Sequence, residues 1–364
     1  MDSPGELPDD AWDDFVESLP DGHHEQTSRW GQVRARTGWA VARTVVREGG
    51  GIAGGFQMQT RPLGRLGRLA YVTYGPCRKS PDPILGNAMI AGLKQQALRL
   101  GARFLVVGLP YDGQDLASGL VAAGFQRKPS RFPPHFLEAT SVINLSREPE
   151  AIFSAMHRSK RRNVRCGLKR GIRVVESAGA GLMEFHRLMV ALCQRRNTTP
   201  NPAKAEFFTE LWKRFQPKGW VRLFLAMHGP EPVSAALAFT FGGWFRVWKV
   251  GWSGRHATLK PNDLLWWQMI LQAHRDGFRC FDLVGIDPEQ AKRTACAGGS
   301  EDDHATVTSF KLGFGGECRF LPGAYYYLCN PVWRLLGRHG LGRWLESPLF
   351  LKAAGPFLGR ISSG

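Results

Sequence analysis

The stretches GARFLVVG, residues 101–108, and GFRCFDLVG, residues 277–285, are alike and decide the fold. Each follows a segment whose apolar spacing predicts a helix, and each supplies an apolar run that predicts a strand. Upstream of both, the chain repeats the same order of strands. The predicted elements are strands at 40–46, 52–59 and 69–75 with a helix at 84–100, and strands at 221–227, 233–241 and 245–252 with a helix at 261–274. The sequence therefore contains one structural pattern twice.

Several antiparallel strands, a helix and a final strand are the order of a GNAT-like α/β acyltransferase lobe. A chance similarity between two ordinary α/β units is the alternative. We predict an α/β (α+β) protein with two tandem GNAT-like lobes and a cleft between them. The expected divisions are an acidic N-terminal segment at 1–28, a first lobe at 29–145, a second lobe at 146–330 and a basic amphipathic tail at 331–364.

Basic residues outnumber acidic ones, with 48 Lys and Arg against 31 Asp and Glu and a formal net charge of +17. This charge attracts polyanions, so RNA, a nucleotide-linked substrate and an anionic membrane surface are candidate partners. The first 28 residues hold nine acids and no Lys or Arg, the reverse of a secretory signal. Seven scattered cysteines without a C-x-x-C pair argue against zinc and against a disulfide framework. We expect a cytoplasmic protein with no membrane span and no metal.

Most GNAT enzymes hold the CoA pyrophosphate on an R/Q-x-x-G-x-G/A loop that opens a helix. Residues 61–67, RPLGRLG, come close in letters, but they precede an expected strand, and the equivalent segment 254–261 has one glycine only. We interpret 61–67 as a basic hairpin turn. The pattern favours an acyl donor other than acyl-CoA.

Short runs spread in order over residues 26–327 resemble the Fem family of peptidyltransferases, which use aminoacyl-tRNA and are built from two GNAT-like lobes. The runs are QTSRWGQVR at 26–34, YVTYGP at 71–76, KRRNVRCGLKRGI at 160–172, FDLVGI at 281–286, FKLGFGGE at 310–317 and PGAY at 322–325. The resemblance implies transfer of an aminoacyl group from charged tRNA to a primary amine, with no cofactor besides that co-substrate. The acceptor would be a peptide, a cell-wall precursor or a small biosynthetic amine.

Two departures from the family pattern bear on the acceptor and on the size of the second lobe. Lys79 stands where the family has an acid, and Thr73-Tyr74 stands where it has Pro-Arg, which weakens the case for a peptidoglycan precursor. Some members carry a long helical arm, whereas the segment 184–215 has room only for an ordinary helix pair.

The resemblance places Phe310 and Lys311 where the acceptor end of tRNA meets the amine. A phenyl ring can stack on a terminal base, and an ammonium group can stabilise charge on the ester or a phosphate. The alternative is a strand with one core aromatic and one solvated lysine. Asp282, in an expected strand, is either a structural carboxylate or a base that accepts the proton of the amine.

Cations crowd residues 158–173 at helical spacing and predict a basic helix face that can lie along phosphates, a solvated charged helix being the alternative. The residues assigned to tRNA binding are Arg158, Lys160, Arg161, Arg162, Arg165, Lys169 and Arg173, together with Trp252 and Arg319. For Trp252, core packing is the alternative to stacking on a base.

By the same resemblance, the acceptor side is assigned to Trp30, Arg34, Tyr71, Tyr74 and Lys79. Arg34 follows Trp30 by one helical turn, and its charge can bind a phosphate of a nucleotide-linked acceptor. Core packing for Trp30 and solvent for Arg34 are the alternative.

Two other functions remain as alternatives. A GNAT-type N-acyltransferase would use acyl-CoA or an acyl carrier protein on a sugar or peptide amine, as in envelope polysaccharide synthesis. A non-catalytic protein of this fold would bind tRNA without turnover. The tail at 331–364 interleaves apolar and basic residues, so it either docks on its own protein or makes a peripheral contact with an anionic membrane.

Overall fold

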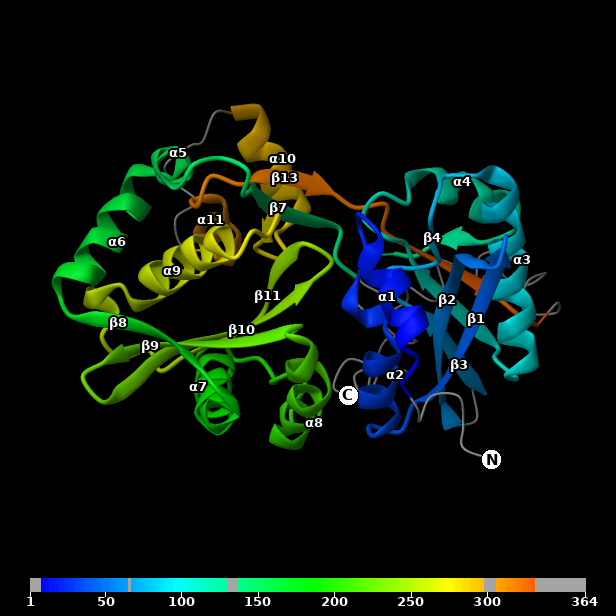
Figure 1. Cartoon of the computed structure of the whole chain (residues 1–364), viewed down its shortest axis with the longest axis horizontal. Helices are drawn as coiled ribbons and strands as arrows, with labels where there is room; N and C mark the ends of the chain where they lie inside the picture. Colours follow the sequence, from blue (N-terminus) through cyan, green and yellow to red (C-terminus); the bar gives the residue numbers. More distant parts are fainter. Residues whose placement is uncertain (1–7, 65–66, 130–135, 298–305, 331–364) are drawn as a thin grey trace. The chain divides into compact units, whose positions relative to one another are not determined.

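The computed structural model describes residues 8–64, 67–129, 136–297 and 306–330 (Figure 1). The chain divides into a first unit, residues 1–136 with 321–364, and a second unit, residues 137–320. Each unit contains one seven-stranded sheet. No helix among the described residues has both the length and the apolar content needed to cross a membrane. The tail at 331–364 lies outside the described residues.

The first unit is built on a sheet with the order β1-β2-β3-β5-β14-β6, with β4 paired to β2. Its strands are β1 (Ala40–Glu48), β2 (Gly51–Pro62), β3 (Arg68–Val72), β4 (Cys77–Arg78), β5 (Phe104–Gly108), β6 (Gln126–Arg127) and β14 (Ala324–Leu328). Its helices are α1 (Asp10–Ser18), η1 (His24–Gln26), α2 (Ser28–Ala35), α3 (Pro83–Arg99) and α4 (Gln114–Ala122). Only the β3–β5 pair is parallel within this set, and α3 supplies the crossover between these two strands.

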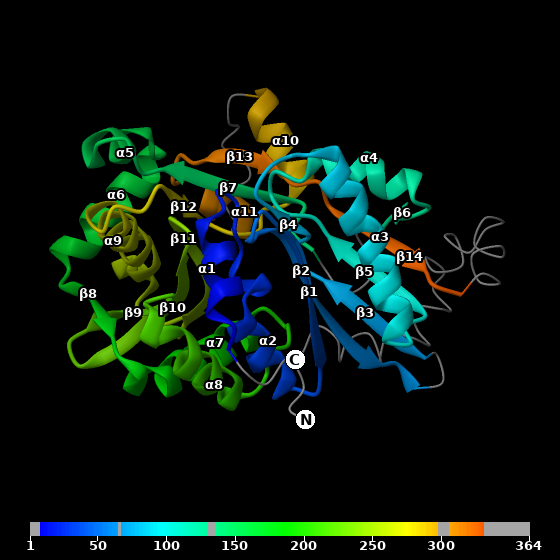
Figure 2. The ribbon, with the colours of Figure 1, turned by 45° about the vertical axis from the view of Figure 1, so that its right-hand side comes forward.

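Helix α3 shows why the local sequence folds as it does. Asp82 accepts the backbone N–H groups of Ile84 and Leu85, and Pro83 occupies the first turn, where a missing N–H has no cost. Met89 and Leu93 lie on the buried face of the helix, and Figure 2 shows α3 and α4 beside the β5 and β14 strands.

The second unit has a sheet with the order β13-β7-β12-β11-β10-β9-β8. Its strands are β7 (Ala139–Asn144), β8 (Ile172–Ser177), β9 (Val221–His228), β10 (Glu231–Phe241), β11 (Trp244–Trp252), β12 (Cys280–Asp282) and β13 (Glu317–Phe320). Its helices are α5 (Pro149–Ala155), α6 (Arg158–Lys169), η3 (Gly179–Gly181), α7 (Leu182–Arg195), α8 (Ala205–Phe215), η4 (Gln216–Lys218), η5 (Ala257–Leu259), α9 (Pro261–Arg275), α10 (Pro288–Ala297) and α11 (Val307–Leu312). Figure 1 shows α9 on one face of the sheet and α7 and α8 on the other.

The two sheets repeat one topology, as the sequence predicts. The order β1-β2-β3-β5 of the first sheet matches the order β9-β10-β11-β12 of the second, and in both sheets the last two strands are parallel and joined through a helix. The expected helices and strands agree with the observed ones to within a few residues, and Pro62 of β2 pairs with Arg68 of β3, as a hairpin between these two strands requires. The predicted helix pair at 184–215 is α7 and α8. The fold is therefore two tandem GNAT-like lobes.

The lobe boundaries differ from the expected ones because two strands are exchanged. Strand β7 follows the first unit along the chain, yet it pairs with β12 and β13. Strand β14 follows the second unit, yet it pairs with β5 and β6. The divisions consequently fall after Phe136 and after Phe320, instead of at 145 and 330.

The acidic N-terminal segment is part of the first unit. Trp12 of α1 is fully buried, and its Nε1 donates to the carbonyl of Gln26 at 2.7 Å. Buried Asp13 accepts a hydrogen bond of 2.7 Å from Ser28 Oγ and forms an ion pair with Arg29. The acids of this segment therefore help to anchor α1 to α2.

Candidate active site

Lys311 lies on α11, and its ammonium group reaches the turn that follows β12. The Nζ atom donates to the carbonyl of Val284 and, at 2.7 Å, to the carbonyl of Gly285. The segment is a helix and not the strand considered from the sequence, because Thr306 Oγ1 accepts the N–H of Ser309 and begins the helix. Lys311 is also partly buried and not solvated.

The turn under Lys311 has an unusual backbone. Val284 has a φ of 50° and Gly285 a φ of 61°, both in the left-handed region. For a β-branched residue such as Val284 this conformation is strained, so the surrounding structure must hold it. The N–H of Val284 donates to Asp282 Oδ1 at 2.8 Å. The turn thereby presents two successive carbonyl oxygens to one ammonium group.

Burial lowers the pKa of Lys311 to about 8, while the carboxylate of Asp282 raises it and the charges of Arg196 and Lys249 lower it further. The ammonium form is favoured at neutral pH, but it loses its proton far more readily than an ordinary lysine. A lysine with such a pKa in a structured site is a candidate for a functional role.

Asp282 is fully buried in β12 and accepts a hydrogen bond from Thr140 Oγ1 as well as the one from Val284. Its Oδ2 lies 3.8 Å from Nε of Arg246, which is 1% exposed. These contacts favour the structural interpretation of Asp282 over the role of a base, because the carboxylate is engaged by the groups that anchor the turn.

Phe310 packs in an aromatic group with a lysine over its face. Its ring centroid lies 5.5 Å from that of Trp266 and 5.4 Å from that of Phe314, both in edge-on geometry. Lys160 Nζ lies 3.5 Å from the Phe310 centroid and 2.9 Å from Asp263 Oδ1. Phe310 is therefore held in place through a buried ion pair.

Lys160 does not belong to the basic helix face to which the sequence analysis assigns it. It is 8% exposed, and it lies with Val164 and Gly167 on the side of α6 that packs against α9. Helical spacing alone cannot distinguish a buried cation from an exposed one. The sequence feature that could have identified Lys160 as buried is its partner Asp263, an acid in the first turn of α9.

The rest of the predicted basic face is present on and beyond α6. The exposed members are Arg158, Arg162, Arg165, Lys169 and Arg173, and Arg161 is partly buried. The guanidinium group of Arg165 lies 5.2 Å from the ring centroid of Phe153. These cations form a positive surface of the second unit.

Trp252 and Arg319 are on strands β11 and β13 and not on α6. Trp252 Nε1 donates to the carbonyl of Arg255 at 3.3 Å, and the guanidinium group of Arg195 lies 4.2 Å from its ring centroid. One face of the indole is thus covered by an arginine. Arg319 is on β13, 5.7 Å from the ring centroid of Trp244.

In the first unit, Trp30 is core and Arg34 is buried. Trp30 is 5% exposed and Arg34 is 6% exposed, which agrees with core packing for Trp30 and contradicts the alternative of solvent around Arg34. Arg34 Nε donates to Gln59 Oε1 at 2.9 Å, and its guanidinium carbon lies 4.6 Å from the Trp39 ring centroid. Burial lowers the pKa of Arg34 to about 10, so it still carries its charge at neutral pH.

Tyr71 joins this group, which we call the Arg34 cluster: Arg34, Trp39, Gln59 and Tyr71. Its ring centroid lies 6.0 Å from that of Trp39, and burial raises the pKa of its hydroxyl. Among the described residues, Gln59 Nε2 and Trp39 Nε1 are buried without a hydrogen-bond acceptor. Buried donors of this kind are costly unless a ligand satisfies them. The sequence analysis missed Gln59. A polar residue within the otherwise buried stretch of β2 is the sequence feature that could have identified it.

Tyr74 and Lys79 are not in the Arg34 cluster. Tyr74, with a φ of 49°, stacks on His23 at a centroid distance of 3.6 Å and lies 5.8 Å from Tyr111. Lys79 is exposed just after β4.

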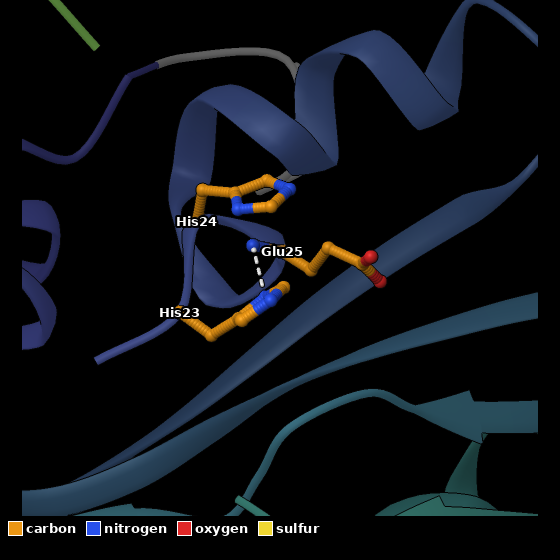
Figure 3. A group of neighbouring side chains, drawn as sticks. All are labelled: His23, His24 and Glu25. Atoms are coloured by element: carbon orange, nitrogen blue, oxygen red, sulfur yellow. Dashed lines mark hydrogen bonds between the residues drawn. The ribbon is translucent and has the colours of Figure 1, made fainter. Parts of the chain in front are cut away.

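His23, His24 and Glu25 form a group that the sequence analysis did not predict. Their potential ligand atoms lie within 4.8 Å of one another, and His23 Nδ1 accepts the N–H of Glu25 at 3.3 Å (Figure 3). Both rings also take part in aromatic packing, His23 on Tyr74 and His24 edge-on to Trp30. Aromatic packing accounts for the two rings, and we assign no metal to them.

Residues 154–293 match the family model described as an acetyltransferase (GNAT) domain. A curated relative, the lipid II:glycine glycyltransferase of Staphylococcus haemolyticus (strain JCSC1435), is 27% identical over 229 residues, which cover 61% of this chain and 54% of that protein. The chain thus spans about half the length of the curated relatives it matches.

Solved structures show the same fold. The structure described as "Crystal structure of FemX" has a TM-score of 0.77 and 19% identity, and the match covers 91% of this chain and 98% of that one. A tandem GNAT protein from the clavulanic acid biosynthesis pathway has a TM-score of 0.52 and 13% identity, with 88% of this chain and 95% of that one covered. At these identities the likeness concerns the fold.

Proposed function

We propose that this chain, a Fem-type protein of two GNAT-like lobes, transfers an aminoacyl group from aminoacyl-tRNA to a primary amine of a cell-wall precursor. The observation that carries the proposal is the Lys311 ammonium group, fixed by two carbonyls next to Phe310. The name of the curated relatives, lipid II:glycine glycyltransferases, supports a wall precursor as the acceptor despite Lys79. Charged tRNA as the donor puts the reaction in the cytoplasm.

In the proposed reaction, the neutral amine attacks the carbonyl carbon of the aminoacyl ester. A C–N bond forms, the ester C–O bond breaks, and the amine proton ends on the ribose oxygen that leaves. Lys311 has three N–H donors, of which Val284 and Gly285 accept two, so one donor remains to stabilise charge on the ester oxygen or a neighbouring phosphate. The ester is already activated, so no covalent intermediate is required.

The Arg34 cluster supports an acceptor site in the first unit. It offers a charged guanidinium group and two buried N–H donors, a set that suits a phosphate-bearing acceptor with further carbonyl or hydroxyl oxygens. The enclosure by Trp39 and Tyr71 strengthens each of these bonds, because water is excluded.

Replacing Arg34 by Met is expected to raise the KM for the acceptor at least ~10-fold, because the acceptor no longer receives a charge-assisted hydrogen bond. The kcat and the affinity for tRNA should stay within a factor of about two. Initial rates at varied acceptor concentration measure this split. Arg36→Met, at an exposed arginine two positions further on, is the matched control. A drop in kcat at unchanged KM would exclude a binding role for Arg34.

The exposed cations of α6 support a contact with the tRNA backbone. The double substitution of Arg162 and Arg165 by Ala is expected to weaken binding of charged and uncharged tRNA alike. The plot of log affinity against log salt should become shallower by ~1 for each phosphate that the variant no longer neutralises. Filter binding over a salt series measures both effects, with Arg99→Ala on α3 of the first unit as the control. An unchanged salt slope would remove α6 from the tRNA contact.

The donor is tested by offering the protein labelled aminoacyl-tRNA, free tRNA and acetyl-CoA in parallel, with a lipid-linked wall precursor as the amine. We expect preference for one charged tRNA and movement of the label to the precursor. Binding of acetyl-CoA together with indifference to tRNA charging would assign the chain to the ordinary N-acyltransferases. Binding of tRNA without any transfer would assign it to the non-catalytic class.

A further inference from the structure

A cavity of the second unit lies where β7 ends and β12 begins, and it has a volume of about 610 Å³. Its walls come from β7 and the loop after it, from the end of α9, and from the starts of β12 and β13. Neither Lys311 nor Phe310 lines it. Lys311 binds at Val284, which follows the end of β12 opposite to Cys280. The cavity is therefore distinct from the proposed transfer site.

The charged groups on the wall are mostly basic. Arg147, Arg279 and Arg319 line the cavity, against the carboxylate of Glu317. Each guanidinium group has five N–H donors in a planar fork that matches a phosphate group. Three guanidinium groups around one cavity can together donate hydrogen bonds to a bound anion.

Two of the three guanidinium groups are held by a hydrogen bond to the backbone of the second unit. Arg279 Nη2 donates to the carbonyl of Gly242 at 2.8 Å, and its Nε lies 2.6 Å from where a Cβ of residue 243 would stand. Only a glycine, with its φ of 79°, lets Arg279 lie across this turn. Arg147 Nη2 donates to the carbonyl of Ala151 at 3.2 Å. Each of these guanidinium groups uses one N–H group in its hydrogen bond and retains other N–H donors for a ligand.

The wall also has apolar and aromatic parts. Phe278 and His274 are among the lining residues, with the ring of Phe278 also packed edge-on against Phe245 at a centroid distance of 5.8 Å, and partly buried Cys280 lines the same cavity. Burial raises the pKa of this thiol while the charges of Arg319 and Arg279 pull it down, which places both guanidinium groups near Cys280. The volume exceeds that of a phosphate ion and falls within the range of sites for small organic ligands.

We propose that this cavity binds a nucleoside phosphate, with the phosphate on Arg319, Arg279 and Arg147 and the base against the planar side chains of the wall. Arginine forks recognise the phosphate, and ring faces stack on a base. The ligand is either a free nucleotide or one nucleotide of an RNA, and both have this chemistry. Neither Lys311 nor Phe310 takes part in this site, whereas Arg319 is also one of the residues assigned to tRNA binding from the sequence.

Calorimetric titration of the full chain with AMP, adenosine and inorganic phosphate tests the site without any turnover. AMP should bind saturably, and adenosine and phosphate at least ~10-fold more weakly, because each can engage only one half of the site. Arg147→Ala and Arg319→Ala should each weaken AMP binding at least ~10-fold. Arg147 is exposed, so its replacement should leave folding intact. Arg275→Ala, at an exposed arginine of α9 that does not line the cavity, should bind AMP like the parent chain.

Competition with uncharged tRNA separates the two sources of the nucleotide. Displacement of AMP by tRNA, with weaker tRNA binding in Arg319→Ala, supports a nucleotide of RNA. Loss of AMP binding in the variants with unchanged tRNA binding supports a free nucleotide. Absence of AMP binding to the parent chain, or equal binding by the parent and both variants, would overturn the proposal. A chain that fails to transfer aminoacyl groups would still bind AMP here, so the two proposals fail separately.

Discussion

Replacing Lys311 by Ala is expected to lower the turnover of aminoacyl transfer at least ~10-fold at pH 7, since removal of one donor from a developing oxyanion has an effect of this size or larger. The substitution removes the ammonium group that Val284 and Gly285 hold. Single-turnover rates with charged tRNA and acceptor at saturation give the chemical step directly. Lys292→Ala, at an exposed lysine of α10, controls for the removal of a charge elsewhere in the unit.

The same variant gives a pH test with a defined sign. Burial sets the pKa of Lys311 at about 8, so its charge is present below that pH and is lost above it. The ratio of parent to Lys311→Ala rates should therefore be largest below pH 8 and fall towards one as the pH rises past it. Deprotonation of the attacking amine affects both proteins equally and cancels in the ratio. A ratio that grows with pH would make Lys311 a proton acceptor, and a ratio near one throughout would remove it from the mechanism.

Replacing Asp263 by Leu is expected to lower the free energy of unfolding by about 3–5 kcal/mol, because it leaves the Lys160 ammonium group buried without its counter-charge. Both side chains are about nine-tenths buried, and Nζ lies 2.9 Å from Oδ1. Urea unfolding measures the change. The double variant Lys160→Met with Asp263→Leu should recover most of it, since two apolar side chains of similar volume suit the same space. Equal instability of the single and double variants would show that the ion pair itself is not the cause.

The Asp263→Leu variant is also expected to become more stable as the pH rises. Burial already lowers the pKa of Lys160, and without Asp263 it falls further. The folded protein then binds fewer protons than the unfolded chain, so stability rises as the pH increases through the folded pKa towards the ordinary lysine value. The difference from the parent should shrink over that window. Recovery of stability at alkaline pH would confirm that the unpaired charge of Lys160 causes the instability of the variant.

The repeated pattern made the two sheets predictable from the sequence, because strand and helix periodicities are local properties. The pairing partner of a strand is not local. The sequence analysis did not assign β7 or β14 as strands. Their amino-acid sequences do not indicate that β7 pairs in the sheet of the second unit and β14 in the sheet of the first. The same limit applies to Lys160, whose inward direction depends on Asp263 of a distant helix.

The family resemblance singled out Phe310 and Lys311, but the contacts that these side chains make required the structure. The helix at 307–312 depends on the cap at Thr306, whereas the β-branched start of that segment favours a strand. The burial of Arg34 depends on Gln59 of β2 and on Trp39. Such polar residues inside a buried strand are visible in the sequence, but their partners become clear only once the strands are paired.

The exchange of β7 and β14 also affects how this protein can fold during its synthesis on the ribosome. When the first unit has left the exit tunnel, β5 still lacks its neighbour, because its backbone groups pair with Ala324–Leu328 near the end of the described chain. At ~5–20 residues per second, that edge stays open for roughly ten seconds or more of translation. An open edge with the apolar side chains of β5 is prone to wrong pairing. The two lobes therefore cannot mature one after the other, and completion of the first sheet waits for the synthesis of β14.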